Sequence, residues 1–448
     1  MIFDSESVFE ENVITVLKQH GWKDGVLRYP TERDLLDNWK GILYRNNNDI
    51  DRLGKYPLTD GEMTQIIEQI ETLRTPLALN SFVNGRTVSI TRDNKEDVAH
   101  FGKEVSLYIY DRKEIAGGKS TYQIAQQPVY PAKNKMLNSR RGDLVLLING
   151  MPLIHIELKK SGIPVSQATN QIEKYAHEGV FTGLFRLVQI FVAMNPDDAV
   201  YFANPGVDKF NPSYYFHWAD YNNEPICGGQ NPGKDEWKLF IGGTSGTAGL
   251  LSIPMAHQLI GFYTIADSAD GCLKVLRSYQ YIAANAISDV VRKCDWEQRP
   301  ATPGRPGGYV WHTTGSGKTM TSFKSAQLIA DSHDADKVVF LMDRIELGTQ
   351  SLKEYRSFAD SETEVQGTEN TGVLRDKLNS TNVNDTLIVT SIQKMSNVKA
   401  GVYRKSGAVL FVKRYAAIAA VVALGIVVAI YSTKKGRIFH GGFTRDRG

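Results

Sequence analysis

Three charged residues lie at the margins of two apolar runs in GDLVLLINGMPLIHIELKKSG, residues 142–162. Asp143 opens the first run, and Glu157 and Lys159 end the second. Two carboxylates side by side repel, and each raises the pKa of the other. Mg²⁺, a small cation that prefers oxygen ligands, removes this repulsion, and a bound metal ion activates water for attack on a phosphate. Lys159 would orient that water or neutralise the developing anion, so the three residues indicate phosphodiester hydrolysis.

The elements that carry these residues read as a β-hairpin. Both runs are short and continuous, which is typical of strands buried on both faces. The pair Asn149-Gly150 predicts the turn, because both central residues of a type I′ turn need positive φ. A strict two-residue turn pairs Asp143 with Ile156, whereas a three-residue loop with a bulge pairs Asp143 with Glu157. We favour the second arrangement, or a bend at Asp143 with the same result; the alternative is a hairpin whose ends happen to be charged.

A helix predicted over residues 165–178 adds two polar side chains. Gln171 and Tyr175 stand four apart and therefore project from one face. With this helix the sequence resembles the PD-(D/E)xK nucleases, in the branch with a Gln-x-x-x-Tyr helix after the Glu-x-Lys strand. The resemblance implies a mixed α/β fold, catalytic roles for the residues named so far, a metal on the two acids, and helix polars that support the catalytic groups and the DNA backbone. A helix is also predicted over residues 5–19. Three of its acids could supply a further metal contact, but we favour the alternative that they form a solvated face: Glu6, Glu10 and Glu11.

A phosphate-binding loop is predicted in GYVWHTTGSGKTMTSF, residues 308–323. A strand, a glycine-rich loop and a helix follow one another, and glycines let backbone N–H groups curl around phosphates. Lys318 would reach the β- and γ-phosphates, Thr319 would hold Mg²⁺, and the helix that starts near Lys318 adds its dipole. His312 replaces the usual first glycine, a variant that resembles helicase-type motors. The residues expected to bind ATP here are Thr314, Gly315, Ser316, Gly317, Lys318 and Thr319.

The segments around this loop resemble superfamily 2 helicases. LRSYQYIAANAI, residues 276–287, resembles their adenine-reading motif, with Gln280 on the adenine edge; an exposed helix glutamine is the alternative. Two buried strands are predicted downstream, one ending in Asp343-Arg344 and the other in Thr390 and Gln393. In the family such strand ends line the nucleic-acid track, although each alone is an ordinary strand followed by a loop.

A Gln-x-x-x-Tyr nuclease ahead of a superfamily 2 motor resembles the motor (R) subunit of type I restriction endonucleases, over residues 5 to about 400. The resemblance implies Mg²⁺ and ATP as cofactors, and double-stranded DNA, a methyltransferase (M) subunit and a specificity (S) subunit as partners. In that family ATP-driven translocation precedes cleavage. Sequence recognition belongs to the other subunits, which fits the lack of a major-groove reading motif. We therefore expect a nuclease domain over 1–258, a partial RecA-like P-loop domain over 259–400 and an atypical tail over 401–448.

The resemblance stops after Gln393, where no D-E-x-H strand and no second RecA-like domain follow. We expect ATP binding without hydrolysis or translocation. We favour unrelated sequence after a truncation or frameshift for the tail. Its residues 415–432 are uncharged, and as a helix they would span about 27 Å, close to a bilayer core of roughly 30 Å. A membrane anchor and a packed core helix are the alternatives.

Composition sets the remaining expectations. The net charge of +3 excludes a global basic field, so a polyanion would have to be met by a local groove. Cys227, Cys272 and Cys294 form no close pair, and the acidic start of the chain is unlike a signal peptide; both suit the cytoplasm. Rival functions are a non-catalytic or membrane-tethered DNA-binding remnant, and a stand-alone helicase with a degenerate nuclease. The intact nuclease motif disfavours the helicase.

Overall fold

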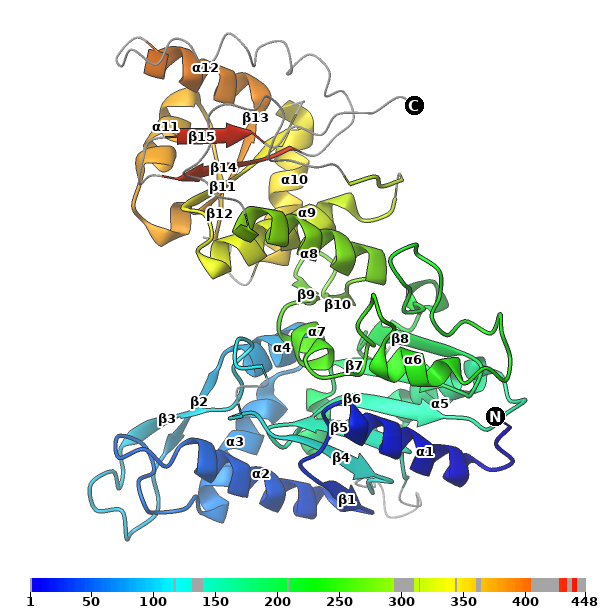
Figure 1. The fold of residues 1–448 in the computed structure, drawn as a ribbon. Coiled ribbons are helices and arrows are strands. Elements are labelled where there is room, and N and C mark those ends of the chain that lie inside the picture. The colour runs from blue at the N-terminus through cyan, green and yellow to red at the C-terminus, as the bar shows by residue number, and fades with distance from the viewer. Residues whose placement is uncertain are drawn as a thin grey trace. The chain divides into compact units, whose positions relative to one another are not determined.

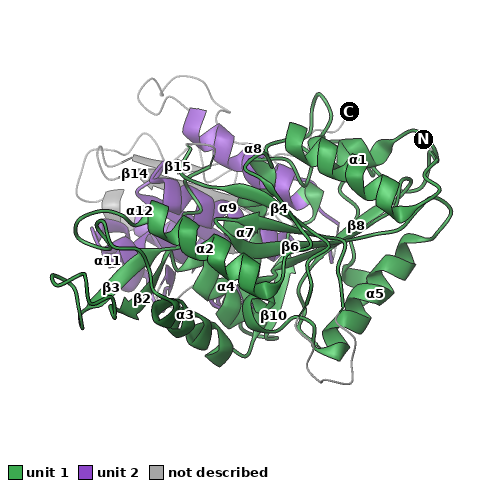
Figure 2. Ribbon diagram, turned by 90° about the horizontal axis from the view of Figure 1, so that it is seen from below, with its two compact units in different colours: residues 1–279 green, residues 280–448 purple. Residues whose placement is uncertain are grey.

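The chain divides into two compact units, Met1–Tyr279 and Gln280–Gly448, in the computed structural model (Figures 1 and 2). Both units combine helices with a mixed β-sheet, which confirms the predicted α/β class. The structure describes residues 2–115, 118–130, 140–207, 209–293, 310–313, 315–342, 345–359, 364–403, 427–432 and 437–440.

A six-stranded sheet in the order β1-β4-β5-β6-β7-β8 forms the centre of unit 1. Strand β6 pairs antiparallel with β5 and parallel with β7. Every residue of β5 and β6 is buried, which explains their continuous apolar sequences. The strands are β1 (Val26–Arg28), β4 (Tyr122–Gln126), β5 (Leu144–Ile148), β6 (Met151–Leu158), β7 (Ile190–Met194) and β8 (Ala199–Ala203).

Helices α1 (Glu6–Gln19) and α5 (Val165–Glu178) lie on opposite sides of this sheet (Figure 2). Both follow the predicted ranges. The Ser5 hydroxyl caps α1 by accepting a hydrogen bond from the Val8 N–H group (3.3 Å), and α5 packs its apolar face on β7 and β8. The other helices of unit 1 are α2 (Glu32–Asn46), α3 (Asp60–Thr72), α4 (Pro76–Asn84), α6 (Glu236–Gly242) and α7 (Met255–Gly261), with 3₁₀ turns at Gly183–Leu187 and Pro212–Tyr214.

A separate hairpin pairs β2 (Thr87–Thr91) with β3 (Glu104–Tyr108), and the loop that joins the two strands contributes to a buried ion cluster with α3. The Arg92 guanidinium contacts the carboxylates of Glu62 (2.7 Å) and Asp97 (3.0 Å), and none of the three side chains is more than 1% exposed. A buried cation of this kind needs partners of opposite charge.

The division between the units follows the hairpin β9 (Thr264–Asp267) and β10 (Cys272–Val275), whereas the sequence-based boundary at 258/259 precedes it. This hairpin contacts α4 and β8. The Tyr201 hydroxyl, from β8, also donates to the Leu276 carbonyl (2.9 Å). The hairpin therefore belongs with unit 1.

The apolar residues 183–194 do not form one continuous element. Their first half, Gly183–Leu187, is a 3₁₀ turn, and Ile190–Met194 is the strand β7. Both halves are apolar and buried, and apolar content alone does not separate these conformations.

Unit 2 is built on a five-stranded sheet in the order β12-β13-β11-β14-β15. β12, β13 and β11 run parallel, β14 pairs antiparallel with β11, and β15 pairs antiparallel with β14 at the edge of the sheet. The strands are β11 (Lys337–Met342), β12 (Val365–Gly367), β13 (Leu387–Ser391), β14 (Val427–Ser432) and β15 (Arg437–His440). The helices are α8 (Ser278–Lys293), α9 (Lys318–Ser332), α10 (Ile345–Phe358), α11 (Thr371–Asn379) and α12 (Ile392–Tyr403), with a 3₁₀ turn at Val383–Asp385.

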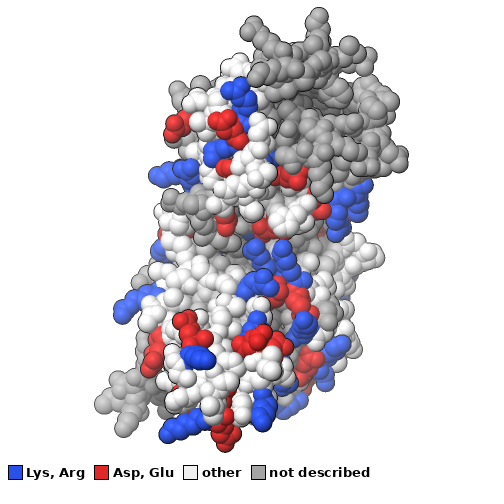
Figure 3. All heavy atoms as spheres, turned by 90° about the vertical axis from the view of Figure 1, so that its left-hand side faces the viewer, with Lys and Arg blue, Asp and Glu red and all other residues white. Residues whose placement is uncertain are grey.

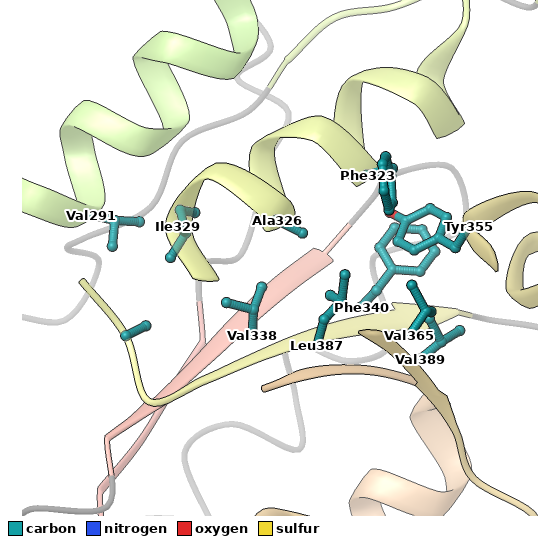
Figure 4. Close-up of a cluster of buried hydrophobic side chains, with 11 residues drawn as sticks. Val291, Phe323, Ala326, Ile329, Val338, Phe340, Tyr355, Val365, Leu387 and Val389 are labelled. Atoms are coloured by element: carbon teal, nitrogen blue, oxygen red, sulfur yellow. The ribbon is translucent and has the colours of Figure 1, made fainter. Parts of the chain in front are cut away.

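Two apolar clusters bury opposite faces of this sheet. On one face, Phe323 of α9 and Tyr355 of α10 lie beside Phe340 of β11, and α9 places Ala326 and Ile329 near Val338 (Figure 4). On the other face, α11 and α12 cover alternate residues of the same strands, among them Val339. This alternation follows from the two-residue period of a strand and produces three layers.

The structure differs from two expectations for the C-terminal region. The described residues 310–313 before the phosphate loop are not in a strand, and the edge of β11 opposite β13 is paired with β14. Residues 415–426 of the predicted membrane segment lie outside the described residues, and Val427–Ser432 is the strand β14. Among the residues placed by the structure, no helix is long and apolar enough to cross a bilayer.

Candidate nuclease and nucleotide sites

The hairpin of β5 and β6 brings the two predicted acids opposite each other. Asn149 and Gly150 both have positive φ (53° and 84°), so the turn has two residues and the expected three-residue loop is wrong. A bulge in β6 changes the register instead, since Leu146 pairs with Ile154 but Leu147 pairs with Pro152. Proline has no N–H group for the ladder, which suits such a site. Beyond the bulge Leu144 pairs with Ile156, and Asp143 therefore stands opposite Glu157, the register that we favoured.

The two carboxylates are buried together at the end of the hairpin. Glu157 is 0% exposed, and neither of its carboxylate oxygens has a hydrogen-bond partner among the described residues. Asp143 accepts a hydrogen bond at Oδ2 from the Leu158 N–H group (2.7 Å). Burial, and then the neighbouring Glu157 charge, raises the pKa of Asp143 to about 8. Burial likewise raises the pKa of Glu157 to about 8. Without a cation the pair therefore tends to hold a proton at neutral pH.

Lys159 lies next to this pair and is largely buried. Its Nζ donates to the Leu158 carbonyl (2.8 Å) and lies 3.6 Å from Glu157 Oε1 and 3.6 Å from Glu6 Oε1. The ammonium group is thus placed between a buried and a half-exposed carboxylate. The structure brings together the three residues Asp143, Glu157 and Lys159 that the sequence singled out.

Helix α5 adds the predicted polar pair. The Gln171 amide donates to the Tyr175 hydroxyl (2.6 Å), which donates in turn to the Arg141 carbonyl (2.8 Å), two residues before Asp143. Burial raises the pKa of Tyr175, with a further contribution from the Glu157 charge, so the hydroxyl stays protonated. These residues also line an open hollow of about 340 Å³, which is formed by Arg140, Gln167, Asn170, Gln171, Lys174 and Tyr175.

The acids of α1 divide between two environments. Glu10 is buried beside Gln126 and Gln127, whose side-chain amides lie 2.5 and 3.3 Å from its carboxylate, and burial raises its pKa. A solvated face was the wrong expectation for Glu10, because the residue shares the buried side of α1 with Val13 and Leu17. Glu11 is exposed and pairs with Arg28 (2.7 Å), and Glu6 is half-exposed beside Lys159.

Two further residues of the site were missed in the sequence: His155, which contacts Glu157, and Tyr130, which contacts His155. His155 Nε2 lies 3.3 Å from Glu157 Oε2, and its Nδ1 lies 2.9 Å from the Tyr130 hydroxyl. Burial lowers the pKa of His155 to about 4, so the imidazole is neutral at pH 7. His155 could have been found, because it stands two residues before Glu157 and so shares its face of the strand. Only the tertiary fold reveals Tyr130.

The phosphate loop of unit 2 ends at the first residue of α9. Gly315 and Gly317 both have positive φ (79° and 78°), and Gly317 is the N-cap residue of the helix. The Lys318 ammonium and the Ser316 hydroxyl both donate to the Thr313 carbonyl (2.9 and 2.7 Å). Free N–H groups at a helix start favour anions. Thr319 is the second residue of α9, and Thr314 lies outside the described residues.

Other residues predicted for the nucleotide site occupy varied positions. Gln280 is buried, and its amide nitrogen lies 3.4 and 3.3 Å from the Ser316 and Gly317 carbonyls, so it supports the loop backbone; adenine recognition stays a prediction. Thr390 is buried and accepts from the Thr368 hydroxyl (2.7 Å). Gln393 is exposed at the start of α12. Asp343, Arg344 and Cys294 lie outside the described residues.

Comparison with known proteins connects each site with one family. Residues 4–210, which include the acids and α5, match the family described as type I restriction enzyme R protein N terminus. Residues 279–419, which include the phosphate loop, match the family described as SWI2/SNF2 ATPase.

Curated relatives match most of the chain. It is 32% identical to a type I restriction enzyme endonuclease subunit of Staphylococcus saprophyticus over 88% of this chain and 37% of the relative. It is also 32% identical to such a subunit of Staphylococcus aureus (strain MSSA476), over 90% of this chain and 38% of the relative. The EcoprrI endonuclease subunit of Escherichia coli is 26% identical, over 69% of this chain and 90% of the relative. The chain thus spans little more than a third of the length of the staphylococcal relatives.

Proposed function

Because the chain belongs to the family of type I restriction enzyme R proteins, we propose that unit 1 is a PD-(D/E)xK nuclease that hydrolyses double-stranded DNA with Mg²⁺. One observation carries this proposal. Glu157 is fully buried next to Asp143, and neither of its oxygens has a hydrogen-bond partner within the described ranges. A buried carboxylate without partners is unfavourable, and a divalent cation shared with Asp143 would compensate both charges.

The donor set fits Mg²⁺. In the part of the chain that the structure describes, no group of three or more His, Cys, Asp or Glu side chains is placed to hold a metal. Mg²⁺ does not need one, because it is commonly held by one or two carboxylates, water and substrate phosphate. Asp143 and Glu157 would hold the ion, which supplies an electrophile for the phosphate and an acidified water.

The protein's own groups would orient and neutralise the substrate. The Lys159 ammonium, 3.6 Å from Glu157 Oε1, would stabilise negative charge that develops on the phosphate. Gln171 and Tyr175 would orient the DNA backbone at the hollow that they line. Positive and negative side chains are interspersed on the face shown in Figure 3, and the net charge of the chain is only +3, so we expect DNA to be held by a local groove.

The test of the nuclease is substitution of Glu157 in the full chain, assembled with methyltransferase and specificity subunits. Glu157→Ala is expected to abolish nicking of supercoiled DNA in Mg²⁺, while binding of a fluorescent ATP analogue stays unchanged. Glu173→Gln, at a half-exposed position of α5, is the matched control and should cut like the unmodified chain. Cutting by Glu157→Ala at the unmodified rate would remove Glu157 from the site.

For unit 2 we propose Mg²⁺-ATP binding at the phosphate loop, with Lys318 and Thr319 as the side chains that contact phosphate and metal. The position of Lys318 at the start of α9, behind two glycines of positive φ, supports this role. Association with methyltransferase and specificity subunits, and translocation on DNA by the longer family members, form part of the same proposal. Lys318→Ala should abolish binding of the fluorescent ATP analogue and leave Mg²⁺ binding to unit 1 intact.

A further inference from the structure

A buried row of three side chains leads from Tyr130 through His155 to Glu157. Tyr130 is 1% exposed, and the other two are 0% exposed. The Tyr130 hydroxyl lies 2.9 Å from His155 Nδ1, and His155 Nε2 lies 3.3 Å from Glu157 Oε2. The row therefore ends on an oxygen of the carboxylate that the proposed nuclease uses.

The contacts favour one tautomer of His155. If the Tyr130 hydroxyl donates to Nδ1, the ring proton is on Nε2 and points to a carboxylate oxygen. When Glu157 is ionised, as it would be with a bound cation, the opposite arrangement would place a nitrogen lone pair against the charged Oε2, which is repulsive, and the Tyr130 proton would lose this acceptor. Beside an ionised Glu157 the neutral imidazole therefore carries its proton on Nε2, and the hydroxyl on the other nitrogen favours the same choice.

Resting on the proposed function, we propose that His155 is a positioning residue that donates its Nε2 proton to Oε2 of Glu157. This bond would hold the carboxylate in one orientation and leave Oε1, the oxygen that faces Lys159, for the divalent cation. Residues that orient a metal ligand in this way commonly change metal affinity 10- to 100-fold when they are replaced.

The distance between the two atoms suits a bond that forms when the site is occupied. At 3.3 Å the pair lies outside good hydrogen-bond geometry, and neither His155 Nε2 nor Glu157 Oε2 has another partner among the described residues. Hydrogen bonds at catalytic sites are often long before the substrate complex forms and then shorten.

The test is calorimetric titration of the full chain with Mn²⁺ alone, without DNA. His155→Leu should weaken binding about 10- to 100-fold. His155→Gln, whose amide can donate from a similar place, should recover most of that affinity. Tyr130→Phe removes the hydroxyl that favours one tautomer of His155, so its Mn²⁺ affinity should lie between those of the unmodified chain and His155→Leu. A loss of affinity without recovery in His155→Gln would indicate packing alone and would overturn the proposal.

Asp143→Ala separates failure of this inference from failure of the nuclease assignment. If Asp143→Ala loses Mn²⁺ binding but His155→Leu binds like the unmodified chain, His155 has no positioning role and the metal site stands. If Asp143→Ala also binds normally, the metal site and the inference both fail. Urea unfolding without Mn²⁺ identifies variants that do not fold, and if His155→Leu is one of them, the affinity of Tyr130→Phe decides.

Discussion

Replacing Glu157 by glutamine should stabilise the cation-free protein while it removes the proposed metal site. The pKa of Glu157 is raised from the ordinary 4.5 to about 8, chiefly by burial. A carboxyl group whose folded pKa is raised favours folding most below its unfolded pKa. That stability is lost as the pH rises from 4.5 towards 8. A pH of 7 lies about 2.5 units above the unfolded pKa, and each unit lowers the free energy of unfolding by up to about 1.4 kcal/mol. Burial of the Glu157 carboxyl therefore lowers the free energy of unfolding at pH 7 by about 3 kcal/mol.

Glutamine at position 157 carries no such penalty, and it also removes a charge that raises the pKa of Asp143. We expect the free energy of unfolding of Glu157→Gln to exceed that of the unmodified chain by about 3 kcal/mol at pH 7, reduced by the lost contact with Lys159. At pH 4 the difference should disappear. Saturating Mg²⁺ should narrow or reverse it, because only the unmodified chain gains stability from binding the ion.

The assay is urea unfolding in chelator, followed by fluorescence of the four buried tryptophans of unit 1: Trp22, Trp39, Trp218 and Trp237. The control is Glu173→Gln at a half-exposed position of α5, which should stay within about 0.5 kcal/mol of the unmodified chain. Equal stability of Glu157→Gln and the unmodified chain at pH 7 would refute the reasoning, since the buried acids would then carry no electrostatic penalty.

Three further outcomes follow from the structure. Lys174→Ala removes an exposed ammonium from the hollow, so DNA binding should weaken and the slope of log affinity against log salt should decrease by about 1 in a fluorescence-anisotropy titration. Glu62→Ala removes one of the two carboxylates that contact the buried Arg92 guanidinium, which keeps Asp97 and the Tyr56 carbonyl, and should lower the free energy of unfolding by about 3–5 kcal/mol in the urea assay; a change below 1 kcal/mol would contradict this. Lys318→Arg should bind the fluorescent ATP analogue more weakly, because the longer planar group does not reproduce the compact ammonium at the loop, and unchanged affinity would argue against a direct phosphate contact.

Local sequence was enough to predict the parts of the site that depend on local rules. The Asn149-Gly150 turn follows from the need for positive φ, and α5 follows from helical periodicity with Gln171 and Tyr175 on one face. The phosphate loop follows from its glycines and from Lys318 at the helix start. Each of these rules acts over a few residues.

Features that depend on distant segments could not be predicted in the same way. The burial of Glu10 depends on side chains more than a hundred residues away, Gln126 and Gln127, and the orientation of His155 depends on Tyr130. The strand expected before the phosphate loop is not present in the described residues 310–313, and β14, from a distant part of the chain, pairs with the edge of β11. The pairing of distant strands is not visible in either strand's own residues.

Because of the bulge in β6, the number of residues between Asp143 and Glu157 does not by itself determine whether the two acids stand opposite each other. Residue Leu153 is accommodated outside the ladder, since Pro152 and Ile154 pair with adjacent residues of β5. A shorter chain without Leu153 would form an uninterrupted hairpin and still place its aspartate across from its glutamate. Proteins with the same chemistry can therefore differ by one position in this interval, and a motif search that demands a constant interval would pass over them.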